Sequence, residues 1–275
     1  MSSTLALWSS HSLRADGARV TLRVAPGLDT LEPVLARWIE DGVDTLPVFR
    51  RSRYASVHRV KPGDTAPPVF LKQFLLRGPS DRIKRYFRRS RARRTLAANV
   101  LIEELGFRTE QIIALAEFRR FASLSKSLLV TREIPDVNEA RSVFRDPEFG
   151  LRSDINRRRR LLERLGREIG AWHGAGLYHG DLRLSNVLMQ IEGDDCTFYW
   201  MDNERTRRYA RLPRARRAHN LMQIIMDPGV FSRTDMMRLW RTYQSVCGFA
   251  PEDEKQFLRS VIDRTRKRWK SRNWL

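Results

Sequence analysis

Residues 179–186 have the sequence HGDLRLSN, a polar segment with neither helical nor strand periodicity. The preceding stretch, 157–177, predicts a helix with one buried face, because its apolar residues recur at helical spacing. These residues are Leu161, Leu165, Ile169 and Trp172. Two apolar runs follow, VLMQI at 187–191 and TFYWM at 197–201, and they predict a pair of short strands around the turn EGDD. The polar segment is therefore a loop that connects a long helix to a small hairpin.

This loop carries an aspartate and an asparagine at a spacing that suits phosphoryl transfer. Asp181 lies two residues after His179, and Asn186 lies five residues after Asp181. In a protein-kinase catalytic loop of the pattern H-x-D-L-x-x-x-N, the aspartate accepts the proton of the attacking hydroxyl and the asparagine holds magnesium. The loop therefore predicts Asp181 as the catalytic base and Asn186 as a metal ligand. His179 is expected to fix the shape of the loop, and His173 to cap carbonyls at the end of the helix.

Two further residues have settings that fit the same chemistry. Asp202 follows the second strand of the predicted hairpin, where a kinase has its principal metal-binding aspartate. Lys72 lies in the middle of the apolar strand VFLKQF at 69–74, and a buried ammonium needs an anion such as a nucleotide phosphate. Taken alone, a strand-ending aspartate is a common turn residue and a strand lysine can face solvent. The order of the four residues along the chain favours the kinase interpretation.

The first half of the chain is predicted to be a mostly antiparallel sheet with one or more helices. Residues 1–17 are polar and aperiodic and are expected to be poorly ordered. Residues 30–42 predict a short amphipathic helix, and 80–105 a long basic helix or helix pair that stops at Gly106. The strand candidates share alternating or continuous apolar patterns. They are RVTLRVA (19–25), RYASVHRV (53–60), PVFLKQF (68–74), IIALAEF (112–118) and SLLVTREI (127–134).

The second half is predicted to be mainly helical. Beyond the loop and hairpin, three helical patterns follow residue 205, at 218–226, 234–246 and 252–269. The change of character predicts an α+β fold of two lobes that meet near residues 132–138. The boundaries expected are an N-lobe at 18–134 and a C-lobe at 135–275.

The composition limits the classes of protein and of partner. The 275 residues include 45 Arg and 7 Lys, and the net charge is +20. Arginine grips phosphate with a planar fork, so the excess indicates polyanionic partners, although a GC-rich genome would also produce it. The two cysteines, Cys196 and Cys247, are far apart and fit neither a disulfide scaffold nor a zinc site. With no apolar run of membrane-spanning length and a poor signal peptide, the protein is expected in the cytoplasm or on the cytoplasmic face of the inner membrane.

From about residue 50 nearly to its end, the chain resembles the lipopolysaccharide kinase (Kdo/WaaP) family. The segments that carry the resemblance are VFLKQF, SRARRTLAANVLIEELGF, LLVTREI, AWHGAGLYHGDL and MDNERTR. These bacterial enzymes have a protein-kinase-like fold with a small antiparallel-sheet N-lobe and a mainly helical C-lobe. They phosphorylate sugars of the lipopolysaccharide inner core with ATP.

The resemblance implies a role for five residues. Lys72 matches the phosphate-binding lysine and Asp181 the catalytic aspartate. Asn186 and Asp202 match the metal ligands, and backbone groups of Glu133, in the hinge after LLVT, would contact adenine. The implied cofactors are ATP and Mg²⁺, and the implied partner is lipopolysaccharide or a related anionic glycolipid whose Kdo or heptose is phosphorylated.

The chain also departs from the kinase pattern. The segment 48–60 before Lys72 contains no glycine, so a glycine-rich phosphate loop is missing. The family's helix glutamate aligns with Thr95; Glu103 or Glu104 could substitute, or each could face solvent. Because the loop has HGD where many protein kinases have HRD, regulation through a phosphorylated activation segment is not expected.

Three alternatives remain open on sequence grounds. Thr95 would fit a pseudokinase or regulatory binding module, and the residues do not exclude a kinase of a protein or another small molecule. The charge would fit a nucleic-acid-binding protein, but no basic reader motif is present and no nucleic acid is expected.

The arginine-rich stretches 77–94, 157–160 and 205–217 would recruit the anionic acceptor. The basic tail with Trp269 and Trp274 could lie on an anionic inner membrane or fray as a helix end.

Overall fold

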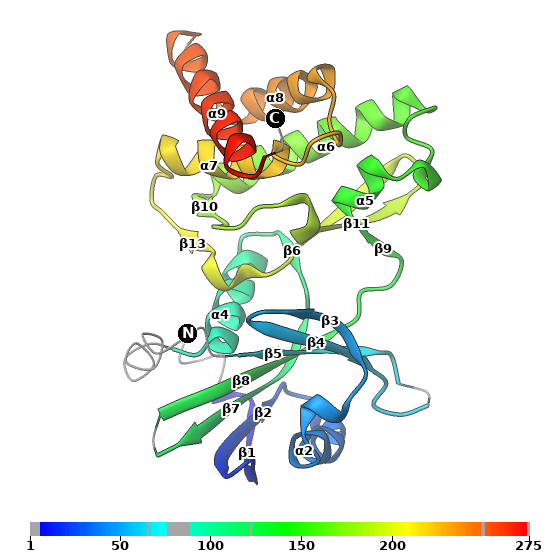
Figure 1. Cartoon of the computed structure of the whole chain (residues 1–275), viewed down its shortest axis with the longest axis vertical. Helices are drawn as coiled ribbons and strands as arrows, with labels where there is room; N and C mark the ends of the chain where they lie inside the picture. Colours follow the sequence, from blue (N-terminus) through cyan, green and yellow to red (C-terminus); the bar gives the residue numbers. More distant parts are fainter. Residues whose placement is uncertain (1–5, 65, 76–88, 122, 249–250, 274–275) are drawn as a thin grey trace. The chain divides into compact units, whose positions relative to one another are not determined.

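The computed structural model describes residues 6–64, 66–75, 89–121, 123–248 and 251–273 (Figure 1). The chain divides into two compact units. We call Met1–Val100 with Glu110–Ile134 the strand unit, and Leu101–Thr109 with Pro135–Leu275 the helical unit. Among the described residues no helix is both long and apolar enough to cross a membrane.

The strand unit contains one antiparallel sheet of seven strands in the order β1-β2-β7-β8-β5-β4-β3. The strands are β1 (Ser9–Ala15), β2 (Ala18–Val24), β3 (Val48–Ser52), β4 (Ala55–Val60), β5 (Val69–Phe74), β7 (Ile112–Arg120) and β8 (Ser123–Arg132). The helical segments are η1 (Asp29–Leu31), α2 (Glu32–Glu40), η2 (Val43–Thr45) and α4 (Arg91–Glu104), whose last turn belongs to the helical unit. The predicted antiparallel sheet is therefore confirmed. The first part of the predicted helix 80–105 lies outside the described residues.

The expectation that residues 1–17 are poorly ordered is wrong for residues 9–15, which form β1. Every residue of β1 pairs with β2. Ala15 is buried, Leu13 packs against the core, and His11 lies 3.2 Å from Glu32 of α2. An edge strand of this kind buries only one face. Because serines occupy positions on both faces of SSHSLRA, the alternation of apolar and polar residues that predicts a strand is not apparent in the sequence.

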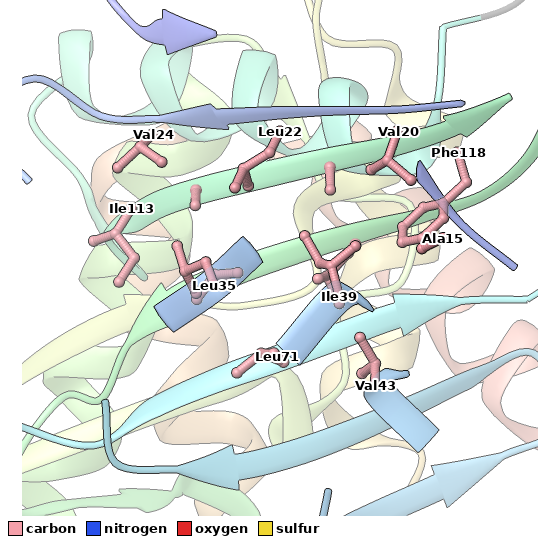
Figure 2. Close-up of a cluster of buried hydrophobic side chains, with 14 of the residues drawn as sticks. Ala15, Val20, Leu22, Val24, Leu35, Ile39, Val43, Leu71, Ile113 and Phe118 are labelled. Atoms are coloured by element: carbon pink, nitrogen blue, oxygen red, sulfur yellow. The ribbon is translucent and has the colours of Figure 1, made fainter. Parts of the chain in front are cut away.

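The two faces of the sheet pack against different helices. One face packs against α2 and forms a buried apolar cluster (Figure 2). Leu71 belongs to that cluster, whereas Phe74 belongs to a second cluster with Ala92 and Leu96 of α4. Because side chains alternate along a strand, Lys72 projects from the α4 face. The sheet thus holds Lys72 in a half-buried position on the side of α4.

The helical unit contains the predicted long helix, the hairpin and three later helices. The helices are α5 (Ala140–Arg145), η3 (Pro147–Phe149), α6 (Ile155–Gly174), η4 (Leu184–Asn186), η5 (Asn203–Arg205), α7 (Arg214–Ile225), α8 (Arg233–Cys247) and α9 (Pro251–Ser271). The strands are β6 (Arg108–Thr109), β9 (Val137–Glu139), β10 (Leu177–Tyr178), β11 (Val187–Glu192), β12 (Asp195–Trp200) and β13 (Arg207–Arg208). They form a sheet in the order β6-β12-β11-β9 and a separate β10–β13 pair.

Two glycines of α6 allow a close approach to α8. A Cβ atom at Gly166 would lie 2.7 Å from the backbone oxygen of Leu239, and one at Gly170 would lie 2.8 Å from Cβ of Val246. Neither separation is tolerated by van der Waals radii, so both positions need glycine for the observed packing. The interior of the helical unit therefore depends on a G-x-x-x-G pair.

Gly166→Ala should lower the free energy of unfolding by about 2 kcal/mol, because the added methyl overpacks against backbone that cannot rotate away. Gly174→Ala at the end of the same helix is the matched control, since among the described residues nothing beyond its own stretch of helix would lie within 4 Å of a Cβ atom there. Urea denaturation of both variants measures the difference. Equal stability of the two variants would contradict this account of the α6–α8 contact.

Candidate active site

The HGDLRLSN loop is fixed by two amide side chains of α7. Asn220 Oδ1 accepts a hydrogen bond from the backbone N–H of His179 (3.2 Å), and Gln223 Oε1 accepts one from the N–H of Leu182 (2.9 Å). Asn220 Nδ2 also donates to Gln223 Oε1 (3.1 Å). Both amide side chains are buried. Asp181 lies between the two anchored residues, so one helix sets the position of its backbone.

The ring of His179 supports the loop in a defined tautomer. Its Nε2 lies 2.9 Å from the carbonyl oxygen of Met201, to which it must donate, and its Nδ1 accepts from the N–H of Asp181 (3.3 Å). This pairing requires a neutral ring. Burial accordingly lowers the pKa of His179, although the carbonyl of Met201 and the carboxylates of Asp202 and Asp181 oppose the shift. The predicted shape-fixing contacts of His179 are present.

Asn186 and Arg183 both bind Asp181. Asn186 Nδ2 donates to the backbone oxygen of Asp181 (2.9 Å), so Oδ1 of Asn186 is the side-chain atom that could coordinate a metal ion. Arg183 Nη2 donates to Oδ2 of the Asp181 carboxylate (3.0 Å) and holds its orientation. The Asp181 side chain remains partly exposed at 26%. The carboxylate is therefore oriented and can still be reached by an incoming hydroxyl.

Asp202 is joined to the same loop through the backbone. The N–H of Met201 donates to the backbone oxygen of Asn186 (2.9 Å), and Asp202 follows with a left-handed conformation, φ +58°. Buried Asn203 secures this turn by donating to the carbonyl of Trp200 (2.7 Å). Asp181, Asn186 and Asp202 thus belong to one hydrogen-bonded part of the helical unit. A carboxylate and an amide oxygen are donors that Mg²⁺ accepts, so Asn186 and Asp202 fit a magnesium site.

The other two predicted residues, Lys72 and Glu133, lie in the strand unit. The Nζ atom of Lys72 is 5.4 Å from the centre of the Phe74 ring. Glu133 directly follows β8, and its carboxylate accepts two hydrogen bonds from Arg59 (3.0 and 2.9 Å). The N–H of Glu133 donates to the backbone oxygen of Pro68 (3.1 Å). A contact between this residue and adenine would therefore use its carbonyl oxygen.

Thr95 lies at the position of the family's helix glutamate, and its side chain bonds within its own helix. Its side chain is buried, and Oγ1 donates to the carbonyl of Arg91 in the same helix (3.0 Å). Glu103 and Glu104, the two candidates for a substitute, are both exposed. Neither has the buried setting that would orient a carboxylate toward a lysine.

A buried carboxylate of the sheet binds α4 instead. Glu117 of β7 is 2% exposed and lies 2.8 Å from Arg93 of α4, with Arg23 of β2 at 3.9 Å. The helix contributes the cation and the strand the anion. This ion pair attaches α4 to the sheet on the side of β2 and β7.

The structure also explains two sequence departures. At the β3–β4 turn, Ser52 Oγ accepts from the N–H of Ala55 (3.1 Å), so the turn forms without glycine. Gly180 of the HGD motif has φ +79°, and a Cβ atom there would lie 2.9 Å from Cβ of Arg205. An arginine at position 180, as in an HRD loop, does not fit this backbone.

Sequence reasoning missed Asn220, Gln223 and Arg183. The only signal for the amides was their spacing of three residues in the otherwise apolar run AHNLMQIIM. His173, expected to cap carbonyls, instead contacts Tyr243 Oη through Nδ1 (2.9 Å) and Asn220 Oδ1 through Nε2 (3.3 Å). Burial lowers the pKa of His173 to about 3, so it stays neutral in this network.

Comparison with known proteins agrees with this architecture. The sequence profile of the lipopolysaccharide kinase (Kdo/WaaP) family matches residues 69–243, more than half of the chain. No curated protein sequence matches significantly. A solved structure described as WaaP in complex with acyl carrier protein is similar in fold, with a TM-score of 0.62 and 21% sequence identity, over 90% of this chain and 98% of that one. The predicted family and its kinase-like α+β fold are thus confirmed, and this chain belongs to the lipopolysaccharide kinase (Kdo/WaaP) family, whose members are phosphotransferases acting on sugar hydroxyls.

Proposed function

We propose that this kinase transfers the γ-phosphate of ATP to a hydroxyl of Kdo or heptose in the lipopolysaccharide inner core. The observation that carries the proposal is the anchored loop, in which Asp181 is oriented by Arg183 and bonded through its backbone to Asn186. A carboxylate held in this way can accept a proton from a sugar hydroxyl as the hydroxyl attacks phosphorus.

The remaining roles follow from the chemistry of each side chain. Asn186 and Asp202 would hold Mg²⁺, which when bound neutralises charge on the nucleotide phosphates. Lys72 would bind those phosphates as a point charge, and the carbonyl oxygen of Glu133 would accept from the adenine amino group. Most of the rate gain would then come from positioning and charge neutralisation.

Exposed arginines beside the loop fit an anionic acceptor. β13 pairs with β10, the strand that leads into the HGD motif, and it consists of Arg207 and Arg208, both exposed. Arg205 and Arg211, in the same segment, are exposed as well. Arg158, by contrast, donates to Asp235 and to the carbonyls of Phe144 and Val230 and is 14% exposed, so it serves the fold. The segment around β13 is therefore the better candidate for recruiting carboxylates and phosphates of the inner core.

The second candidate function is nucleotide binding without transfer, which Thr95 favours. One experiment separates the two: incubation with labelled ATP and Mg²⁺ against lipopolysaccharide, free core sugars and a test protein. We expect label in the inner-core sugars of lipopolysaccharide. Nucleotide that binds and stays unconsumed with every acceptor would support the regulatory alternative, and label in protein alone would overturn the assigned acceptor.

A further inference from the structure

We propose that the end of β7 with the residue that follows it, 119–121, is a membrane-anchoring tip, which inserts Phe121 into bilayers that contain anionic lipids. Phe121 is 92% exposed, the highest value among the large apolar side chains of the described residues. Its backbone is left-handed, φ +47°, a conformation that bulky residues rarely adopt. Strands β7 and β8 form a long hairpin (Figure 1). Phe121 directly follows β7, so the fold holds its aromatic ring out in solvent on a strained backbone.

The surface around this tip is strongly basic. Arg14 of β1 pairs with Arg19 of β2, and Arg19 pairs with Arg119 of β7. Directly paired residues project to the same face, so three arginines form a row across three neighbouring strands. All three are exposed, as is Arg120 next to Phe121. Such a row concentrates positive charge on one face of the sheet, which fits an anionic partner.

An ion pair joins β8 to the turn between β1 and β2, close to the arginine row. Lys126 of β8 binds Asp16 in the β1–β2 turn, and its Nζ atom lies 4.5 Å from the centre of the Phe118 ring. Asp16 is the only acidic residue in the segments 14–19 and 119–126. Its charge is matched by Lys126, so the arginines give the tip its net positive charge.

A projecting aromatic ring beside a row of arginines fits a bilayer surface better than a protein or nucleic-acid groove. Aromatic side chains partition into the membrane interface, and each nearby basic residue adds about 1 kcal/mol of attraction to an anionic leaflet. The C-terminal tail is the weaker candidate, since Trp269 Nε1 already donates to the backbone oxygen of Met226 (2.6 Å). The inference rests on the proposed function in that it brings the kinase to the membrane that contains its acceptor.

The test compares binding to vesicles of phosphatidylcholine with and without about one third phosphatidylglycerol, in the absence of nucleotide and acceptor. We expect wild-type protein to bind only the anionic vesicles, and Phe121→Ser to weaken this binding at least about tenfold. The matched control is Phe49→Ser, since Phe49 is also exposed, at 61%, but lies on edge strand β3. In Phe121→Trp, brominated lipid should quench the added tryptophan fluorescence.

The proposal would be overturned if the wild-type protein did not bind anionic vesicles, or if Phe49→Ser weakened binding as much as Phe121→Ser. It would also be overturned if Phe121→Ser bound these vesicles fully while the double variant Arg119→Ala/Arg120→Ala no longer bound them. The last result would indicate a general polyanion surface without insertion. Activity toward the water-soluble, deacylated core oligosaccharide should be unchanged in Phe121→Ser. Failure of the anchoring proposal is therefore distinguishable from failure of the proposed kinase function.

Discussion

Asp181→Ala should reduce phosphate transfer by about 10³-fold or more while changing nucleotide affinity less than about threefold. The substitution removes the carboxylate that would accept the hydroxyl proton, and general-base contributions reach this size. It leaves the backbone bonds that hold the loop, because these involve main-chain atoms of residue 181. Turnover with labelled ATP and binding of a fluorescent ATP analogue measure the two effects separately.

Two companion variants make this test sharper. Asp181→Asn keeps an oxygen that can accept from Arg183 but removes the base, so we expect it to be nearly as inactive as the alanine variant. Asp194→Ala, in the exposed β11–β12 turn where Asp194 binds Arg160, is the surface control. An asparagine variant that keeps more than a tenth of wild-type turnover would show that Asp181 only positions and does not accept the proton.

The loop could be predicted from the sequence because its chemistry is local. Asp181 and Asn186 lie within one segment of eight residues, and the helix before it and the strands after it have clear periodicity. The amides that anchor the loop come from α7, 41 residues further along the chain in both contacts. Nothing local to the loop specifies them, since the docking of α7 is decided by tertiary packing.

The attachment of α4 shows the same limit. The family resemblance predicts a glutamate on this helix, at the position of Thr95 or, as a substitute, at Glu103 or Glu104. The buried carboxylate that binds α4 is instead Glu117, which lies within β7 between apolar residues. Its partner, Arg93, is one of many arginines in a basic stretch, and the sequence alone does not distinguish it from its neighbours Arg91 and Arg94. Which charges pair is decided by the face that each element buries.

Asn220→Ala should lower the free energy of unfolding by about 3 kcal/mol and transfer by at least about tenfold. The change removes the acceptor of the His179 N–H and the partner of the His173 ring, and both groups are buried. A buried donor left without a partner costs about 1–3 kcal/mol. Asn220→Asp should have an intermediate effect, because a carboxylate still accepts but cannot donate to Gln223 Oε1.

Urea denaturation gives the stability of these variants, and turnover is compared at a temperature where each remains folded. Asn138→Ala, at an exposed position of β9, is the amide control. The two measurements separate support of the fold from support of the reaction. If Asn220→Ala were destabilised but transferred phosphate at the wild-type rate while folded, α7 would only stabilise the helical unit. A reduced rate in the folded variant, with unchanged nucleotide affinity, would show that Asn220 positions Asp181 through the loop backbone. Among the described contacts, the side chain of Asn220 bonds the loop at the backbone of residue 179 and not at Asp181 itself.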